Sequence, residues 1–402
     1  MTQRKIRYIA RILITLLSVL LTSCSDNSVP TGNNIINPVA IITDPMWPQS
    51  GYNAQNTSSP YAPHSYCNPV NLGEVDWYYD FGSYNYDGAE FCVDSKNNVY
   101  FLWQGYPRNK VFKFRQDGTV IWIKDSLSSP NYAGFSLSPD ETKIYINNDF
   151  GLYCIDSSGI LKWTSTNSGY YTKPAVGKDG TIYTKNWGDI AAINPDGSLK
   201  WTTNAGLSPF SVTKVALDRD ENVYTAERKI TKTDKNGNIK WAYTPKELDF
   251  LTEGLVIDGF GNIYFVNERN NAVYNLYSIS KDGVLRWASK IYTGSSPVIG
   301  PQNKLYMVGN NAYCFDTAGK EIWTKPLPGG VNWGYSLVID DKENMYFLYD
   351  NLQLKAVSLN SAGEPRWMVD LSISGLLPGP SLIPMGRMLV APKRAGKIAC
   401  VR

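Results

Sequence analysis

One phrase recurs through this chain: a glycine, three variable residues and a tryptophan. It occurs at Gly73/Trp77, Gly118/Trp122, Gly159/Trp163, Gly197/Trp201, Gly237/Trp241, Gly283/Trp287, Gly319/Trp323 and Gly363/Trp367. The tryptophans therefore follow one another about every forty residues, which is the length of a four-stranded propeller blade.

Each interval has the same internal order of strand-forming and turn-forming residues. Between Lys173 and Trp201 the runs "PAV", "TIYT", "IAAIN" and "SLKWTT" are rich in β-forming residues and are separated by glycine-containing turns. We name these four strands A to D in chain order. The composition, with 27 Tyr, 12 Trp and 33 Gly against a single histidine, also favours strands and tight turns, so the sequence predicts an all-β protein.

Strand counting predicts the number of blades. Seven complete A–D sets lie between Trp77 and Trp367, and the chain then supplies "PSLIP", "RMLVAP" and "KIACV" before it ends at Arg402. The missing eighth D strand is available as "EVDWYYDF" around Trp77. Pairing this strand with the C-terminal blade would close the ring and remove exposed sheet edges. We expect residues 73–402 to form one eight-bladed β-propeller of four-stranded antiparallel blades.

The N-terminus has the features of an export signal. Cations at Arg4, Lys5, Arg7 and Arg11 precede the apolar run Ile12–Leu21, which is too short to span a bilayer stably. The join "LTSC" resembles a bacterial lipobox, so we expect a signal peptide over residues 1–23, lipidation of Cys24 and a flexible tether over residues 24–45. Ser25, where an inner-membrane retention signal has Asp, favours the outer membrane.

The charge of the mature chain limits its partners. Lys and Arg number 39 and Asp and Glu 36, so loss of the four leader cations leaves a nearly neutral protein with no electrostatic argument for nucleic acid.

Residues 46–72, with Trp47, His64 and Cys67, carry too many aromatics and prolines for a linker. We expect this pre-propeller segment to pack on the last blade, and the propeller to be monomeric.

Several phrases resemble the repeats of the PQQ-like family, the eight-bladed propellers named after quinoprotein alcohol dehydrogenases. They are "PAVGKDGTIY", "AAINPDGSLKW", "CIDSSGILKW" and "SISKDGVLRW", and "WPQSGYNAQNTSSPYAP" is similar to the opening of many members. The resemblance implies that the strand-D tryptophans dock between neighbouring blades. As a lipoprotein, the chain is similar in plan to the propeller lipoproteins of outer-membrane barrel-assembly machines, which implies a protein partner.

The sequence offers little for catalysis. Quinone-dependent members use two adjacent cysteines and acidic and amide ligands for calcium, and this chain has no adjacent cysteine pair and no haem motif, so we expect neither PQQ nor calcium as a cofactor. His64 alone cannot support a catalytic triad or a zinc site. The stretch "DRDEN" at Asp218 begins like a calcium loop but has Val223 and Lys229 where that loop needs Gly and an acid, which favours a turn.

The cysteines also favour structure over chemistry. Cys154, Cys314 and Cys400 fall at one equivalent strand-C position, which Ala192 fills in another blade. Cys67 could reach Cys92 or Cys400 near the ring closure, and we leave both pairings open.

The variable loops carry the candidate binding residues. In antiparallel blades the D–A and B–C connections emerge on one side of the ring. The candidate ligand face on that side comprises Trp103, Trp187, Trp333, Tyr335, Tyr170, Tyr171, Arg228 and Arg269. Aromatic and arginine enrichment is typical of a binding surface, although the same side chains could instead fill the central channel.

These observations predict a non-catalytic, lipid-anchored scaffold of the cell envelope whose loop face engages a protein partner. A surface lipoprotein that binds glycans is the first alternative. A PQQ-dependent or other small-molecule oxidoreductase is the second.

Overall fold

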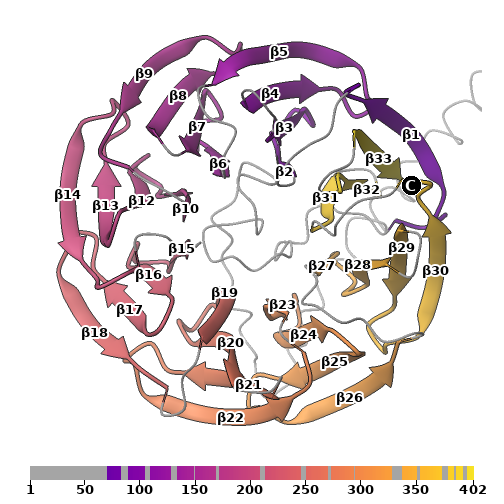
Figure 1. The fold of residues 1–402 in the computed structure, drawn as a ribbon. Coiled ribbons are helices and arrows are strands. Elements are labelled where there is room, and N and C mark those ends of the chain that lie inside the picture. The colour runs from indigo at the N-terminus through magenta and orange to yellow at the C-terminus, as the bar shows by residue number, and fades with distance from the viewer. Residues whose placement is uncertain are drawn as a thin grey trace, which may run out of the picture. The chain divides into compact units, whose positions relative to one another are not determined.

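The computed structural model describes residues 70–82, 89–104, 109–127, 134–148, 150–168, 172–208, 213–245, 250–269, 273–293, 295–327, 337–350, 354–373, 379–383, 386–392 and 396–402. All of them belong to the compact unit Asn37–Arg402. Every regular element in these ranges is a β-strand, and the strands form eight sheets around a ring (Figure 1). The predicted eight-bladed, all-β propeller is confirmed.

The blades follow the chain, with strand A nearest the centre and strand D on the outside (Figure 1). Blades 1 to 4 are β2 (Ala89–Val93), β3 (Val99–Trp103), β4 (Asn109–Phe114) and β5 (Val120–Leu127); β6 (Gly134–Leu137), β7 (Lys143–Asn148), β8 (Gly151–Asp156) and β9 (Leu161–Ser165); β11 (Ala175–Val176), β12 (Ile182–Asn186), β13 (Asp189–Ile193) and β14 (Leu199–Asn204); and β15 (Thr213–Leu217), β16 (Val223–Ala226), β17 (Ile230–Thr233) and β18 (Ile239–Tyr243). Blades 5 to 7 are β19 (Phe250–Ile257), β20 (Ile263–Arg269), β21 (Val273–Ile279) and β22 (Leu285–Ile291); β23 (Val298–Ile299), β24 (Lys304–Val308), β25 (Asn311–Asp316) and β26 (Glu321–Pro326); and β27 (Val338–Ile339), β28 (Met345–Asp350), β29 (Leu354–Leu359) and β30 (Pro365–Asp370).

Blade 8 is completed from the N-terminal side. Its strands are β31 (Ser381–Ile383), β32 (Arg387–Val390) and β33 (Lys397–Val401), and β1 (Val75–Asp80) pairs antiparallel with β33, with Trp77 opposite Cys400. Backbone hydrogen bonds extend the pairing, with Gly73 N donating to Arg402 O at 2.8 Å. The predicted closure is confirmed, and it leaves the two ends of the propeller bound to each other.

The strand-D tryptophans join each blade to the next one. Every Nε1 donates to a backbone carbonyl of the following blade or, at the closure, of Val70: Trp77 to Gln116, Trp122 to Ser157, Trp163 to Pro195, Trp201 to Lys235, Trp241 to Lys281, Trp287 to Thr317, Trp323 to Ser361 and Trp367 to Val70. This confirms the docking that the resemblance implied. It also satisfies the one polar atom of each indole.

The glycine of the repeated phrase belongs to the same contact. A Cβ on Gly319, whose φ is +88°, would lie 2.6 Å from Cδ2 of Trp287, the tryptophan of the preceding blade. The closing pair repeats this geometry, because a Cβ on Gly73 would lie 2.7 Å from Cγ of Trp367. The glycines therefore provide room for the indoles as well as the left-handed turn.

Blade 4 departs from the predicted four strands. The short strand β10 (Thr172–Lys173) pairs in parallel with β15, so this sheet has five strands. Lys173 crosses Gly134 of blade 2, where a side chain would clash, and forms an ion pair with the buried Glu90 of blade 1. This inner segment thus ties blades 1, 2 and 4 together.

The described end of the pre-propeller segment contacts blade 7. Tyr346 Oη accepts a hydrogen bond from Val70 N at 3.0 Å, and Arg366 Nη2 donates to Oδ1 of Asn71 at 3.0 Å. The rest of residues 46–72 lies outside the described residues.

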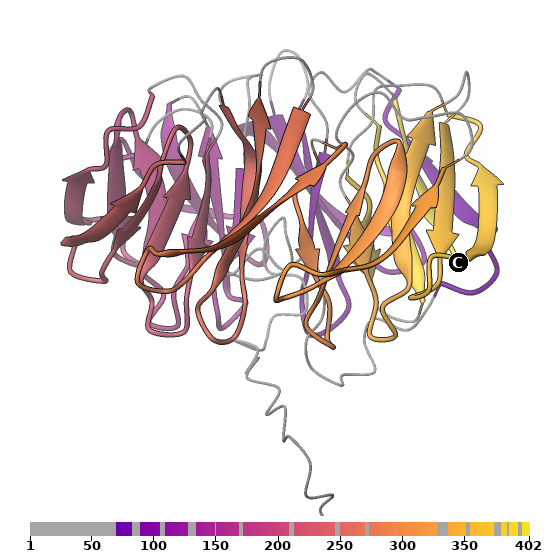
Figure 2. The ribbon, with the colours of Figure 1, turned by 90° about the horizontal axis from the view of Figure 1, so that it is seen from below.

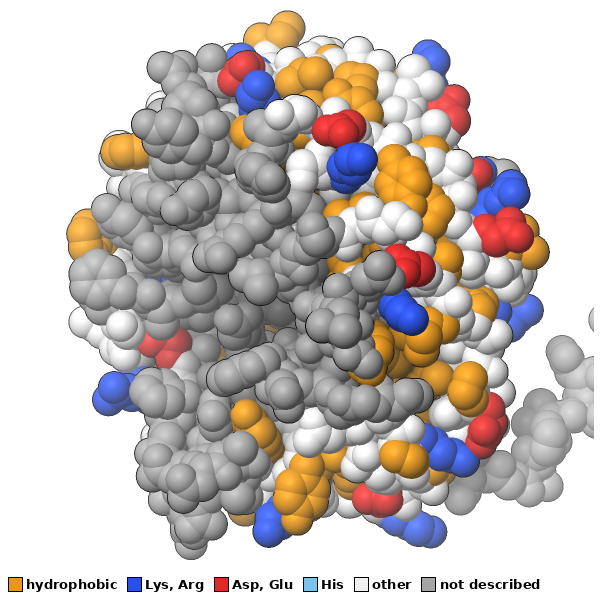
Figure 3. All heavy atoms as spheres, turned by 45° about the vertical axis from the view of Figure 1, so that its right-hand side comes forward, with side chains coloured by type: hydrophobic (Ala, Val, Ile, Leu, Met, Phe, Trp, Pro, Cys, Tyr) orange, Lys and Arg blue, Asp and Glu red, His pale blue; other side chains and the backbone are white. Residues whose placement is uncertain are grey.

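Hairpin turns line one side of the ring, and the strands run between this side and the loop side (Figure 2). On the outer surface, basic and acidic side chains lie beside one another with hydrophobic side chains between them (Figure 3). Lys325 and Glu364, which join blades 6 and 7, are 2.7 Å apart.

Among the described residues, no helix is long and apolar enough to cross a membrane.

The glycine–tryptophan contact predicts a graded response to alanine. In Gly319→Ala the new Cβ would overlap the Trp287 ring, and the left-handed backbone would strain the alanine. Together these effects should lower the free energy of unfolding by roughly 2–4 kcal/mol. Gly82→Ala is the matched control, because Gly82 has a φ of +67° but nothing within 4 Å of the added Cβ, and should lose only about 1 kcal/mol. Urea unfolding measures both, and equal losses would show that the indole contact does not limit stability.

Candidate functional site

The described loop side carries exposed side chains at the B–C turns of three successive blades. They are Phe150 between β7 and β8, Trp187 between β12 and β13, and Arg228 between β16 and β17. Phe150 is 64% exposed and Trp187 is 53% exposed, whereas most of the described phenylalanine and tyrosine side chains are buried. We call these three residues the B–C ledge.

Trp187 is held in an unusual backbone conformation. The turn is short, because Asn186 pairs directly with Asp189, and Trp187 has a φ of +53°. Asn, Asp or Gly normally occupies this left-handed region, and a bulky aromatic residue there is strained. The turn thus keeps an indole exposed at a position where a smaller residue would be favoured.

The turn is fixed from behind by the segment that follows strand D of the same blade. Leu207 N donates to Gly188 O at 3.1 Å. Ser208 N donates to Oε2 of Glu227 at 2.6 Å, and Lys185 Nζ lies 3.1 Å from Oε1 of the same carboxylate. Trp187 is two residues from Lys185 and Arg228 is one residue from Glu227, so both lie close in sequence to the ion pair that joins blades 3 and 4.

Lys185 and Glu227 form an ion pair away from solvent. The Lys185 side chain is fully buried and that of Glu227 is 9% exposed. Burial lowers the pKa of Lys185, and the neighbouring Glu227 carboxylate opposes that shift. The pair gives the two neighbouring turns a rigid, charge-balanced base.

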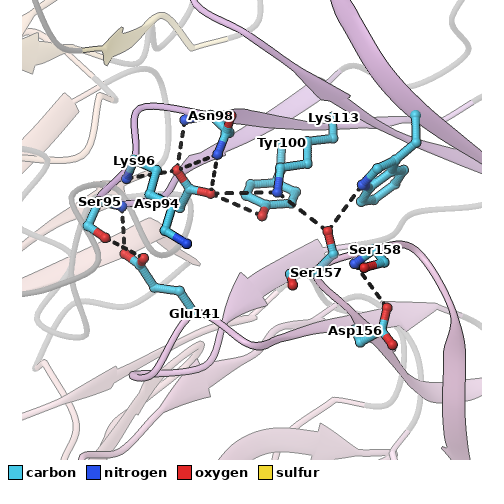
Figure 4. A network of polar contacts seen from close by, with 11 residues as sticks. Asp94, Ser95, Lys96, Asn98, Tyr100, Lys113, Glu141, Asp156, Ser157 and Ser158 are labelled. Atoms are coloured by element: carbon cyan, nitrogen blue, oxygen red, sulfur yellow. Dashed lines mark hydrogen bonds and ion pairs between the residues drawn. The ribbon is translucent and has the colours of Figure 1, made fainter.

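The turn side, by contrast, uses its polar groups for architecture (Figure 4). Asp94 Oδ2 accepts from the hydroxyl of the buried Tyr100 at 3.1 Å, and Asp94 Oδ1 accepts from Asn98 N at 2.7 Å. Lys113 and Trp122 both donate to the carbonyl of Ser157 in blade 2. Burial and the Asp94 carboxylate raise the pKa of Tyr100 well above its usual range, so this tyrosine acts as a hydrogen-bond donor.

Glutamates add a second connection between turns that the sequence did not reveal. Glu141, Glu221 and Glu343 have φ values of 56°, 61° and 61°. Each accepts a hydrogen bond from a backbone N in the turn of the preceding blade: Ser95 at 2.7 Å, Lys178 at 2.6 Å and Gln302 at 2.8 Å. These carboxylates belong to the assembly of the ring.

The "DRDEN" stretch forms the same kind of turn. Asp218 Oδ1 accepts from the backbone N of Asp220 and Asn222, and Oδ2 accepts from the hydroxyl of Tyr224. Within the described ranges, no group of three or more His, Cys, Asp or Glu side chains could hold a metal ion. His64 and Cys67 lie outside those ranges.

The described cysteines lie in the core. Cys154, Cys314 and Cys400 are opposite Tyr145, Tyr306 and Leu389 of strand B, which confirms their equivalent register. Burial raises the pKa of Cys154 to about 11 and that of Cys314 to about 12, so these thiols are protonated at neutral pH.

The structure describes only part of the predicted ligand face. Trp187 and Arg228 lie at B–C turns as predicted, and Arg269 is the last residue of β20 at the same end of its blade. The placement of Trp103 as a loop residue is wrong, because it ends β3, is 3% exposed and packs 6.3 Å from the ring of Phe81. Trp333, Tyr335, Tyr170, Tyr171 and the lipidation residue Cys24 lie outside the described residues.

Sequence reasoning missed Phe150. The signal was present, because "NNDFG" separates two strand-forming runs as "KNWGD" does in the next blade. The exposed aromatic in each phrase occupies the same B–C connection.

The strain at Trp187 predicts that the residue is not kept for stability. Trp187→Asn should raise the free energy of unfolding by about 0.5–1 kcal/mol, because Asn tolerates the left-handed conformation. Thermal unfolding followed by circular dichroism measures the change. A clear loss of stability would instead assign the indole a packing role.

The buried pair predicts strong coupling between blades 3 and 4. Lys185→Met leaves the Glu227 carboxylate buried without its cation and should cost roughly 3–5 kcal/mol, whereas the double variant Lys185→Met/Glu227→Leu should recover most of that loss. Urea unfolding of the two single variants and the double variant gives the coupling free energy. Additive effects would contradict a direct interaction.

Comparison with known proteins supports the fold. No protein-family model matches the chain. A gluconolactonase of Zymomonas mobilis subsp. mobilis is 31% identical over 107 residues, in a match that covers 22% of this chain and 30% of that enzyme. BamB from Moraxella catarrhalis superposes with a TM-score of 0.59 at 14% identity, covering 81% of this chain and 96% of BamB. The Dos1 propeller gives 0.58 at 9% identity, with 81% and 95% covered. At these identities the likeness shows a shared propeller fold.

Proposed function

We propose that this protein is a non-catalytic scaffold of the cell envelope, anchored through lipidated Cys24, which engages a protein partner with the loop side of its propeller. The observation that carries the proposal is Trp187, an exposed indole held in a strained turn. Strain that persists in a folded protein is often associated with function.

The ledge has the composition of a protein-binding surface. Trp, Phe and Arg are enriched in the buried cores of protein interfaces, and Trp and Arg are common among the residues that contribute most to binding energy. Phe150, Trp187 and Arg228 come from three consecutive blades, so one extended partner segment could contact all three. The rigid base of Lys185 and Glu227 reduces the entropy lost on binding.

The structural likeness to BamB and the Dos1 propeller supports the proposal at the level of the fold. The lipobox-like "LTSC" and the polar tether supply the argument for the envelope, and Ser25 that for the outer membrane. The short gluconolactonase match carries no argument for that activity here, because it spans less than a third of the enzyme.

Site-specific crosslinking tests the proposal. A photo-reactive aromatic amino acid at position 187 in the full-length chain should give a discrete adduct with a partner protein in cells, and Arg228→Glu should reduce its yield several-fold. The matched control is Phe260, an aromatic residue that is 58% exposed in the A–B turn on the opposite side.

Equal crosslinking from positions 187 and 260, or none from either, would contradict a partner site on the ledge. Adducts with a glycan in place of a protein would favour the glycan-binding alternative, for which an exposed indole is also suited.

A further inference from the structure

Because the blades repeat, equivalent positions in different blades can be compared. In each blade, the strand-B residue that follows the buried position of the repeated tyrosine lies opposite a residue of strand C, and this cross-strand pair faces the preceding blade. In blades 1 to 8 this pair is Phe101–Phe112, Ile146–Tyr153, Thr184–Ala191, Thr225–Thr231, Phe265–Tyr277, Met307–Tyr313, Phe347–Val357 and Val390–Ala399. Among these described pairs, blade 4 alone has a hydroxyl on both strands.

The next pair toward the turn side repeats the anomaly. Thr233 lies opposite Val223 in blade 4. The other blades have large apolar residues at the position of Thr233, namely Phe114, Ile155, Ile193, Ile279, Phe315, Leu359 and Val401. Since alternate residues of a strand share one face, Thr225, Thr231 and Thr233 all point toward blade 3, against which Val223 packs.

These three threonines are buried, and their hydroxyls have no hydrogen-bond partner in the part of the chain that the structure describes. Each side chain is 0% exposed. Across the interface, the hydroxyl of Tyr183 is buried, and blade 3 has Gly177 where blade 1 has the aspartate that bonds its tyrosine. Buried hydroxyls are almost always hydrogen-bonded in folded proteins.

The loop-side end of the interface is polar as well. Lys185 occupies the position that Leu102, Val266, Val308 and Leu348 fill in other blades. Its charge is balanced by Glu227, so the groups that lack partners are neutral. We call Tyr183, Lys185, Thr225, Thr231 and Thr233 the polar seam.

We propose that the polar seam is a buried water-binding site between blades 3 and 4, in which ordered water molecules accept from and donate to the threonine hydroxyls. A hydroxyl offers both a donor and an acceptor, which matches water. The threonine pair is also smaller than the pairs of phenylalanine, isoleucine, methionine and tyrosine in blades 1, 2, 5 and 6, and a buried water needs both room and several polar neighbours.

Threonine-to-valine substitution in the full-length chain tests the proposal by the sign of the change in Tm. Valine has the shape of threonine without the hydroxyl. If water bonds to the seam, Thr225→Val and Thr231→Val remove its partners and should lower the Tm. If the seam is dry, the same changes remove an unmatched buried hydroxyl and should raise the Tm, which would overturn the proposal.

Thr184→Val is the matched control at the equivalent position of blade 3. Thr184 is also 0% exposed, but its hydroxyl lies 3.0 Å from Oγ of Ser168, so its loss should lower the Tm whatever the seam contains. A high-resolution crystal structure of the unmodified chain gives an independent measurement. Ordered water within about 3.2 Å of the Thr225 and Thr231 hydroxyls is expected, and a seam without it would overturn the proposal.

Discussion

The contact between an indole and the glycine of the next blade is the interaction on which the ring depends. Each tryptophan buries a large apolar face and donates its one N–H to a carbonyl of its neighbour, and the glycine leaves space for the ring. Because the contact runs from each blade to the next, it must also operate between the last blade and the first. Trp77 of blade 8 meets that requirement with Gly118 and Gln116 of blade 1, and Trp367 of blade 7 makes the same contact with Gly73 and Val70, next to the strand that completes blade 8.

This regularity separates architecture from function. On the turn side, aspartates, tyrosines and glutamates bond to one another within and between blades, so their charges and hydroxyls are already used. The interface of blades 3 and 4 breaks the pattern, with a strained Trp187 and a buried ion pair at its loop-side end and three threonines in place of apolar residues along its strands. These departures concentrate in one interface, beneath two members of the B–C ledge.

Most of the fold could be predicted because its signals are local and repeated. The tryptophan period, the strand-B tyrosines and the incomplete C-terminal set led to eight blades and to the closing strand. Trp103 was placed wrongly because "VYFLW" continues strand B to its last residue, where the side chain enters the core. The parallel pairing of β10 with β15 and the glutamate contacts join residues about forty positions apart, and the repeat does not show which partner each of these residues contacts.

The sequence by itself determined the number of blades, the strand order and the residues that close the ring, since a repeat must pack against its own copies in one way only. Tertiary structure decided which aromatic side chains are exposed. Trp103 and Trp187 follow similar strand-forming runs, yet one is 3% exposed and the other 53%. The physical reason is that burial depends on what the neighbouring blade and the following segment place over a strand end, and those contacts form only when the ring is assembled.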